Sequence, residues 1–167
     1  TGTIPTERIL TALDIAEQKR ASLSYANRMS EVNWSERGPN TIGGRTRALL
    51  LDPNDSTNKK LWAAGVTGGL WYTNDITVAA PTWNEVDGTW GNLAVCSISS
   101  DPNDSNTIYV GTGERMGVFS TASRGLGMWK STDGGSSWTH LSSTEGFNYV
   151  TDIIVRNESG SSVVYAG

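Results

Sequence analysis

From residue 34 onward, hydrophobic residues occur in short runs that are separated by segments rich in Gly, Asn, Asp and Pro. Short apolar runs bounded by turn residues are typical of β-strands. Three of the runs end in glycine: Leu61–Gly65, Ile108–Gly111 and Val163–Gly167. The pattern therefore predicts an all-β region over residues 34–167.

The runs recur with a period of about 50 residues, which is typical of proteins built from repeated four-stranded units. Asp-Pro-Asn-Asp-Ser occurs at residues 52–56 and again at 101–105, each time after an apolar run. Each copy is followed by a glycine-ended run, a Gly-x-Trp segment and a further tryptophan. A third copy begins at Val150 and reaches Gly167. We assign the repeats to residues 34–90, 91–147 and 148–167.

Residues 1–33 have a different pattern. Apolar residues recur there at helical spacing from Ile9 to Leu23, although Arg20 interrupts the stripe. This spacing predicts a helix over about residues 7–26. Two roles remain open for it: an extension packed against the β region, or a helix that binds a partner.

The stretch Ser131–Trp138 reads Ser-Thr-Asp-Gly-Gly-Ser-Ser-Trp and lies between two predicted strands, so we interpret it as a hairpin turn. The Asp133 carboxylate can accept hydrogen bonds from N–H groups of the turn, and Gly135 or its neighbour can supply a positive φ. The first repeat holds a degenerate version. It keeps Asp75 but lacks the glycine turn before Trp83.

The fixed positions Ser131, Asp133, Gly135 and Trp138 match the Asp-box of the sialidase-type, or BNR, repeat, and the chain resembles this family. The resemblance implies a β-propeller blade with the box at the turn between its third and fourth strands. In the family the box is an architectural feature that lies away from the catalytic face. The motif therefore points to a fold rather than to a reaction.

A more specific resemblance is carried by Trp34–Leu49 together with Trp62–Trp71. These stretches are similar to the start of secreted "glycosyl hydrolase-like" BNR proteins of Bacteroidota, many of which leave the cell through the type nine secretion system. The resemblance covers residues 34–167. It implies a secreted or cell-surface location and a role in carbohydrate binding.

Closed propellers have about four to eight blades. At a period of about 50 residues, residues 34–167 hold only about 2.7 such repeats. We therefore expect an incomplete β-propeller preceded by an N-terminal α-helix, as the N-terminal portion of a larger protein. The missing blades are expected from the remainder of the protein or from another chain, because blades exposed at both ends would leave apolar faces unburied. A third possibility is a subunit whose open blade edge pairs with another chain, because uncovered strand edges invite β-addition.

Composition narrows the classes of partner. With 37% hydrophobic and 18% charged residues, the 167-residue chain suits a folded domain. The formal net charge of −4 gives no reason to expect nucleic acid as a partner, and the apolar runs are too short to span a membrane. Cys96 is the only cysteine, which excludes an intrachain disulfide and a multi-thiolate metal site. We expect neither a cofactor nor a metal.

Two pairs of charged residues are weak candidates for a catalytic or binding role. Sialidases hold the substrate carboxylate with arginines, whose fork-shaped guanidinium suits that group. Arg45 and Arg47 lie near the place of the family's first arginine, although the Phe/Tyr-Arg-Ile-Pro motif is absent. Glu114 and Arg115 follow a predicted strand and could face a central channel. The alternatives are a structural or solvent-facing role for the arginines and a loop-ordering ion pair for Glu114.

Other features argue against catalysis. Xyloglucan-hydrolysing propellers carry a catalytic Asp before a Gly-Gly in the first blade, and Val66 occupies that position here. Two-carboxylate glycosidase chemistry cannot run on a valine. His140, the only histidine, has no nucleophile–base spacing around it. The two Asp-Pro-Asn-Asp-Ser segments suit type I turns and lack the calcium-loop spacing, which leaves metal binding as the alternative for them.

We therefore predict a secreted or cell-surface β-propeller module that binds a glycan, a surface polymer or a protein. The alternative is a sialidase- or xyloglucanase-like glycoside hydrolase whose active site needs further blades. An enzyme requires carboxylates and arginines that converge on the channel mouth. A binding module requires exposed aromatic residues or a featureless channel.

Overall fold

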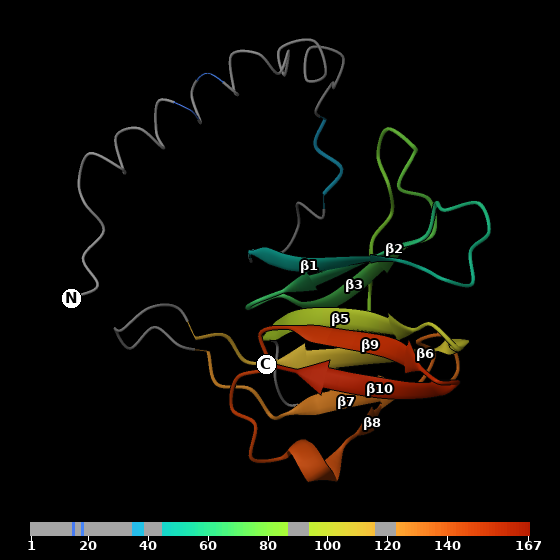
Figure 1. Cartoon of the computed structure of the whole chain (residues 1–167). Coiled ribbons are helices and arrows are strands. Elements are labelled where there is room, and N and C mark those ends of the chain that lie inside the picture. The colour runs from blue at the N-terminus through green and yellow to red at the C-terminus, as the bar shows by residue number, and fades with distance from the viewer. Residues whose placement is uncertain (1–14, 16–17, 19–34, 39–44, 87–93, 116–122) are drawn as a thin grey trace. The chain divides into compact units, whose positions relative to one another are not determined.

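The computed structural model describes residues 15, 18, 35–38, 45–86, 94–115 and 123–167 (Figure 1). The chain divides into two units, Thr1–Glu36 and Arg37–Gly167, and all the described strands belong to the second. The helix predicted over residues 7–26 lies outside the described residues, apart from Ile15 and Gln18, which are exposed. No helix in the described part is long and apolar enough to cross a membrane.

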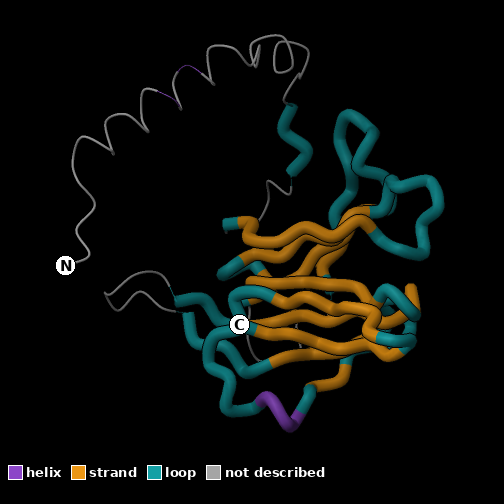
Figure 2. Tube along the Cα trace, in the orientation of Figure 1, coloured by secondary structure: helices purple, strands orange, loops and turns teal. Residues whose placement is uncertain are grey.

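The all-β prediction is confirmed, since the described residues form three antiparallel sheets and only one short 3-10 helix, Ser142–Thr144 (Figure 2). The first sheet contains β1 (Thr46–Leu51), β2 (Leu61–Gly65), β3 (Gly69–Thr73) and β4 (Asn84–Glu85). The second contains β5 (Val95–Asp101), β6 (Asp104–Thr112), β7 (Met128–Ser131) and β8 (Thr139–His140). A hairpin of β9 (Ile153–Glu158) and β10 (Ser161–Ala166) forms the third.

Each strand pairs with the next one along the chain, so that the two larger sheets have the orders β1-β2-β3-β4 and β5-β6-β7-β8. The first strands of the three sheets are neighbours, because β5 contacts both β1 and β9. The three sheets share one pairing pattern. In each of them, an aromatic residue of the second strand lies opposite a residue of the first strand. The pairs are Leu50 with Trp62, Ser99 with Tyr109, and Ile154 with Tyr165.

Two hydrophobic clusters hold the sheets together. The first joins Trp62 and Leu70 of the first sheet to Val95, Ile108 and Val110 of the second. The second joins Tyr109 and Met128 of the second sheet to Ile153 of the hairpin, with Val155 and Val164 packed against them. The first sheet is therefore covered by the second, and the second by the hairpin.

The two Asp-Pro-Asn-Asp-Ser segments are turns whose first carboxylate is buried. Asp52 accepts a hydrogen bond from the N–H of Asn54 at 2.9 Å and another from the indole N–H of Trp62 at 2.9 Å. Asp101 accepts from the N–H of Asn103 at 2.9 Å in the same way. These hydrogen bonds supply the partners that a buried carboxylate requires.

The Asp-box turn closes on itself through its serine and aspartate side chains. The Ser131 hydroxyl donates to Asp133 at 2.8 Å and accepts from the N–H of Gly135 at 2.9 Å. Asp133 also accepts from the N–H of Ser137 at 2.8 Å and from its hydroxyl at 2.5 Å. Gly135 has a φ of 86°, a conformation that costs little only for glycine.

This turn is also the joint between the first two sheets. A Cβ placed on Gly135 would lie 2.3 Å from the ring of Trp62, so the glycine backbone lies directly against the indole. Trp138 meets the same indole edge-on, with ring centroids 6.3 Å apart and an interplanar angle of 81°. The box of the second sheet thus packs on the buried tryptophan of the first.

We predict that Gly135→Ala destabilises the chain by about 3 kcal/mol, because the added methyl group overlaps Trp62 and the positive φ becomes strained. Urea unfolding followed by tryptophan fluorescence measures the change. Gly146→Ala is the matched control, since a Cβ at Gly146 meets nothing within 4 Å. Equal losses in the two variants would show that the close contact with Trp62 does not limit stability.

A second prediction concerns acid pH. The hydroxyl of Ser137, followed by its N–H and the Ser131 hydroxyl, lowers the pKa of Asp133 to about 2, below the ordinary value of about 3.9 in an unfolded chain. The unfolded state therefore binds more protons between these values, and stability falls as the pH drops from about 4 to 2. Asp55, Asp75 and Asp104 also have lowered pKa values, each chiefly through a threonine hydroxyl.

Asp133→Asn is expected to unfold at lower urea at pH 7 and to lose less further stability than the wild type as the pH falls through this range. Urea midpoints measured at several pH values test this. Glu145→Gln removes one exposed negative charge outside the turn and serves as the control. An acid dependence unchanged by Asp133→Asn would refute the assignment.

Candidate functional site

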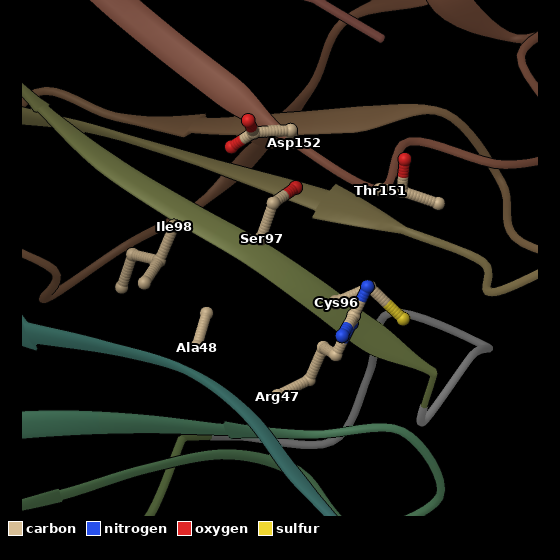
Figure 3. A pocket seen from close by; sticks show the side chains of 7 residues that line it. All are labelled: Arg47, Ala48, Cys96, Ser97, Ile98, Thr151 and Asp152. Atoms are coloured by element: carbon tan, nitrogen blue, oxygen red, sulfur yellow. The ribbon is translucent and has the colours of Figure 1, made fainter. Parts of the chain in front are cut away.

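The first strands of the three sheets border a cleft of about 340 Å³. Figure 3 shows side chains that reach it from β1, from β5 and from the segment before β9. Its lining consists of Arg47, Ala48, Cys96, Ser97, Ile98, Thr151 and Asp152. Residues from three successive repeats therefore meet at one place.

The repeat register explains which residues line the cleft. Ala48, Ser97 and Asp152 each stand one residue before an equivalent first-strand position, Leu49, Ile98 or Ile153, whose partners on the second strands are Ala63, Val110 and Ala166. Arg47, Cys96 and Thr151 stand one residue earlier still. The cleft is thus lined by the same two positions of each repeat. Six of its seven residues belong to this set.

A charged cluster lies at the same end of β1. Glu114 is almost fully buried, with 4% of its side chain exposed, whereas the side chains of Arg45 and Arg47 are about half exposed. A guanidinium N–H of Arg45 donates to one carboxylate oxygen of Glu114, and the Arg47 Nε lies 3.6 Å from the other. A buried carboxylate from the second sheet therefore holds two arginines of the first.

The backbone before Glu114 turns the side chain inward. Gly113 has a φ of 90°, and its N–H donates to Ala94 O at 2.8 Å. A Cβ at Gly113 would lie 2.1 Å from the carbonyl oxygen of Asn148, so no other residue fits. The N–H of Glu114 donates to Ser123 O at 2.8 Å and fixes the residue in place.

Cys96 lines the cleft but is poorly suited to nucleophilic chemistry. Burial, and after it the negative charge of Glu114, raise the pKa of the Cys96 thiol to about 11. Because the thiolate is the reactive form, the protonated thiol is a weak nucleophile at neutral pH. Ser97 is likewise engaged, since its hydroxyl donates to Val150 O at 3.0 Å.

Asp152 is the carboxylate among the residues that line the cleft. Its side chain lines the cleft together with that of Thr151 (Figure 3). The Thr151 hydroxyl donates to Gly167 O at 3.1 Å. Backbone hydrogen bonds between Asp152 and Gly167 hold this segment beside β10. The cleft therefore offers one exposed carboxylate and one guanidinium, with the Glu114 carboxylate already bound to both arginines.

The structure brings three of the four weak candidates together. Arg45, Arg47 and Glu114 form the cluster described above, while Arg115 is exposed and does not line the cleft. Glu114 forms its ion pairs with two arginines of the preceding repeat and not with its neighbour Arg115, so the loop-ordering pair considered for these two residues is not what the structure contains. Asp152 was not among the predicted site residues, because its place in the cleft depends on which strands are neighbours.

The remaining candidates have structural surroundings. Val66 is buried and its N–H donates to Arg45 O at 3.1 Å. The imidazole Nε2 of His140 lies 2.7 Å from Leu126 O, and the ring packs against Trp129 with centroids 4.9 Å apart. Within the described residues, no group of three or more His, Cys, Asp or Glu side chains could hold a metal ion.

No protein-family model matches the chain, and a search of curated proteins finds no similar sequence. The resemblance to BNR repeats therefore stays a prediction. The site has to be interpreted from its own geometry.

The charged cluster yields a prediction about stability. Replacing both arginines, in Arg45→Gln/Arg47→Gln, leaves the buried Glu114 carboxylate without a cation and is expected to cost about 3 kcal/mol. Adding Glu114→Gln removes the unpaired charge and should restore most of that loss.

Urea unfolding of the double and triple variants measures both changes. Arg156→Gln, at an exposed arginine of β9, is the control for the loss of a positive charge. If the double variant were as stable as the wild type, Glu114 would not depend on the two arginines.

Proposed function

We propose that residues 34–167 form part of a β-propeller of the Asp-box type. Two consecutive four-stranded antiparallel sheets and the hairpin that follows support this proposal, because each consists of sequential strands and the first strands are neighbours. The contact of Gly135 with Trp62 gives the Asp-box an architectural role of the kind the family resemblance implies. The remaining blades come from the rest of the protein or from another chain.

The proposed function is binding, at the cleft between the first strands, of an acidic group carried by a glycan or surface polymer. One observation carries this proposal. The buried Glu114 carboxylate holds Arg45 and Arg47 while both arginine side chains remain about half exposed. Arginines fixed in this way lose little side-chain entropy when they bind a carboxylate or sulfate, which favours affinity.

A glycoside hydrolase is the second candidate. The feature that favours it is that Asp152 and Arg47 line one cleft while Arg47 also pairs with the Glu114 carboxylate, because such enzymes need two carboxylates at the reacting bond. Against it, Glu114 is buried and bound to both arginines, and Val66 is apolar. Binding without turnover is therefore the better-supported function.

The proposed location is secreted or at the outer cell surface, with export by the type nine secretion system. This part of the proposal rests on the sequence resemblance of Trp34–Leu49 and Trp62–Trp71 alone. Binding of a glycan or surface polymer is consistent with such a location.

A glycan array followed by calorimetry tests the proposal. We expect oligosaccharides that carry carboxylate or sulfate groups to bind, and their neutral counterparts to bind at least about tenfold more weakly, since a charge-assisted hydrogen bond contributes about 1.5–3 kcal/mol. Arg47→Ala should reduce the affinity for the acidic ligand by a similar factor.

Arg156→Ala, at the exposed arginine of β9, is the matched control and should leave binding unchanged. Equal affinity for neutral and acidic ligands, or equal effects of the two arginine variants, would contradict the proposed site. Release of free sugar from a bound oligosaccharide, lost in Asp152→Asn, would favour the hydrolase instead.

A further inference from the structure

Among the described residues that line the cleft, two side chains can still engage a ligand through a charge. The other polar side chains are occupied, since the hydroxyls of Ser97 and Thr151 and the thiol of Cys96 donate to backbone carbonyl oxygens at 3.0, 3.1 and 3.8 Å. Asp152 is exposed and forms no ion pair with any other described residue. Its carboxylate and the half-exposed Arg47 are therefore the charged groups that a ligand in the cleft would meet.

These two groups carry opposite charges and come from different walls of the cleft. Arg47 belongs to β1 and Asp152 to the segment before β9, and Figure 3 shows them on opposite sides of β5. The Arg47 Nε lies 3.6 Å from the Glu114 carboxylate, and a guanidinium has further N–H donors on its two terminal nitrogens. A ligand can thus meet guanidinium donors on one wall and carboxylate acceptors on the other.

The charges around the cleft favour a ligand that carries both a negative and a positive group. Arg45 and Arg47 balance Glu114 and Asp152, so the formal charge of these four side chains is zero. A purely anionic ligand is attracted by Arg47 but repelled by the Asp152 carboxylate in the same cleft. A ligand that also carries a cation replaces this repulsion with a second ion pair.

We propose that the cleft recognises a zwitterionic sugar unit, that is, an amino sugar that also carries a sulfate or carboxylate group. Arg47 binds the anionic group, while Asp152 binds the ammonium group and determines specificity. Ala48 and Ile98 supply apolar surface for the sugar ring. The cleft volume of about 340 Å³ lies near the lower end of the range for small-molecule sites, about 300–1,000 Å³, which suits a single unit of a polymer.

This inference rests on the proposed binding of an acidic group and adds the requirement for an amine. Two monosaccharides separate the requirements: glucosamine 6-sulfate carries a sulfate and a free amine, whereas the amine of N-acetylglucosamine 6-sulfate is blocked. Neither contains a glycosidic bond, so binding is measured without turnover. At about pH 6, below the pKa of an amine, glucosamine 6-sulfate should bind about tenfold more tightly, because it adds a charge-assisted hydrogen bond. Chemical-shift titration by NMR measures both affinities.

Variants of Asp152 assign the preference to this residue. Asp152→Asn keeps the size of the side chain and removes its charge, so the two sugars should bind it with equal affinity. Asp152→Glu retains the charge and should retain a preference for the free amine. Arg47→Ala should weaken the binding of both sugars. Glu145→Gln, which removes an exposed negative charge outside the cleft, is the matched control and should keep the full preference.

The outcomes separate this inference from the function on which it rests. Equal binding of the two sugars by the wild type, or a preference that survives Asp152→Asn, would overturn the zwitterion proposal and leave the binding of acidic groups intact. Absence of binding by either sugar would overturn both proposals. Circular dichroism and thermal unfolding establish that each variant is folded, and Asp152→Ser replaces Asp152→Asn if the latter unfolds.

Discussion

The packing of Trp62 is the interaction on which the rest of the β region depends. The indole is 1% exposed, and its N–H donates to the buried Asp52 carboxylate at 2.9 Å. Lys60 neutralises that carboxylate from 2.7 Å. Gly135 and Trp138 of the next sheet pack against the indole ring. One side chain thereby links a turn of the first repeat to the Asp-box of the second, and this contact fixes how the two sheets stack.

The stacking in turn creates the cleft. Each repeat contributes the two residues before the same strand position, and these pairs meet only because β1, β5 and β9 are neighbours. The ion pair of Arg45 with Glu114 crosses the same junction between the first and second sheets. The packing of the two sheets, and not a single loop, therefore brings Arg45 and Glu114 together. A site of this kind cannot exist within one repeat.

Much of the fold could be predicted from the sequence because its determinants are local. Apolar runs between turn residues predicted the strands, and Asp133 with its neighbouring glycines predicted a turn that the hydrogen bonds of the Asp-box confirm. The partner of Glu114 could not be predicted, because it lies 69 residues away in another sheet. Asp152 was missed for a similar reason, since its importance depends on which strands are neighbours. The propeller, the family and the function remain predictions.

Glu114 is placed to hold two arginines, because its carboxylate is buried and each of its oxygens faces one of their side chains. A general acid must hold a proton near neutral pH and release it to the substrate, which requires a carboxyl group without strong cationic partners. Glu114 has two such partners, Arg45 and Arg47. For recognition of a ligand the same ion pairs are favourable, because they fix the two arginine side chains and leave them about half exposed.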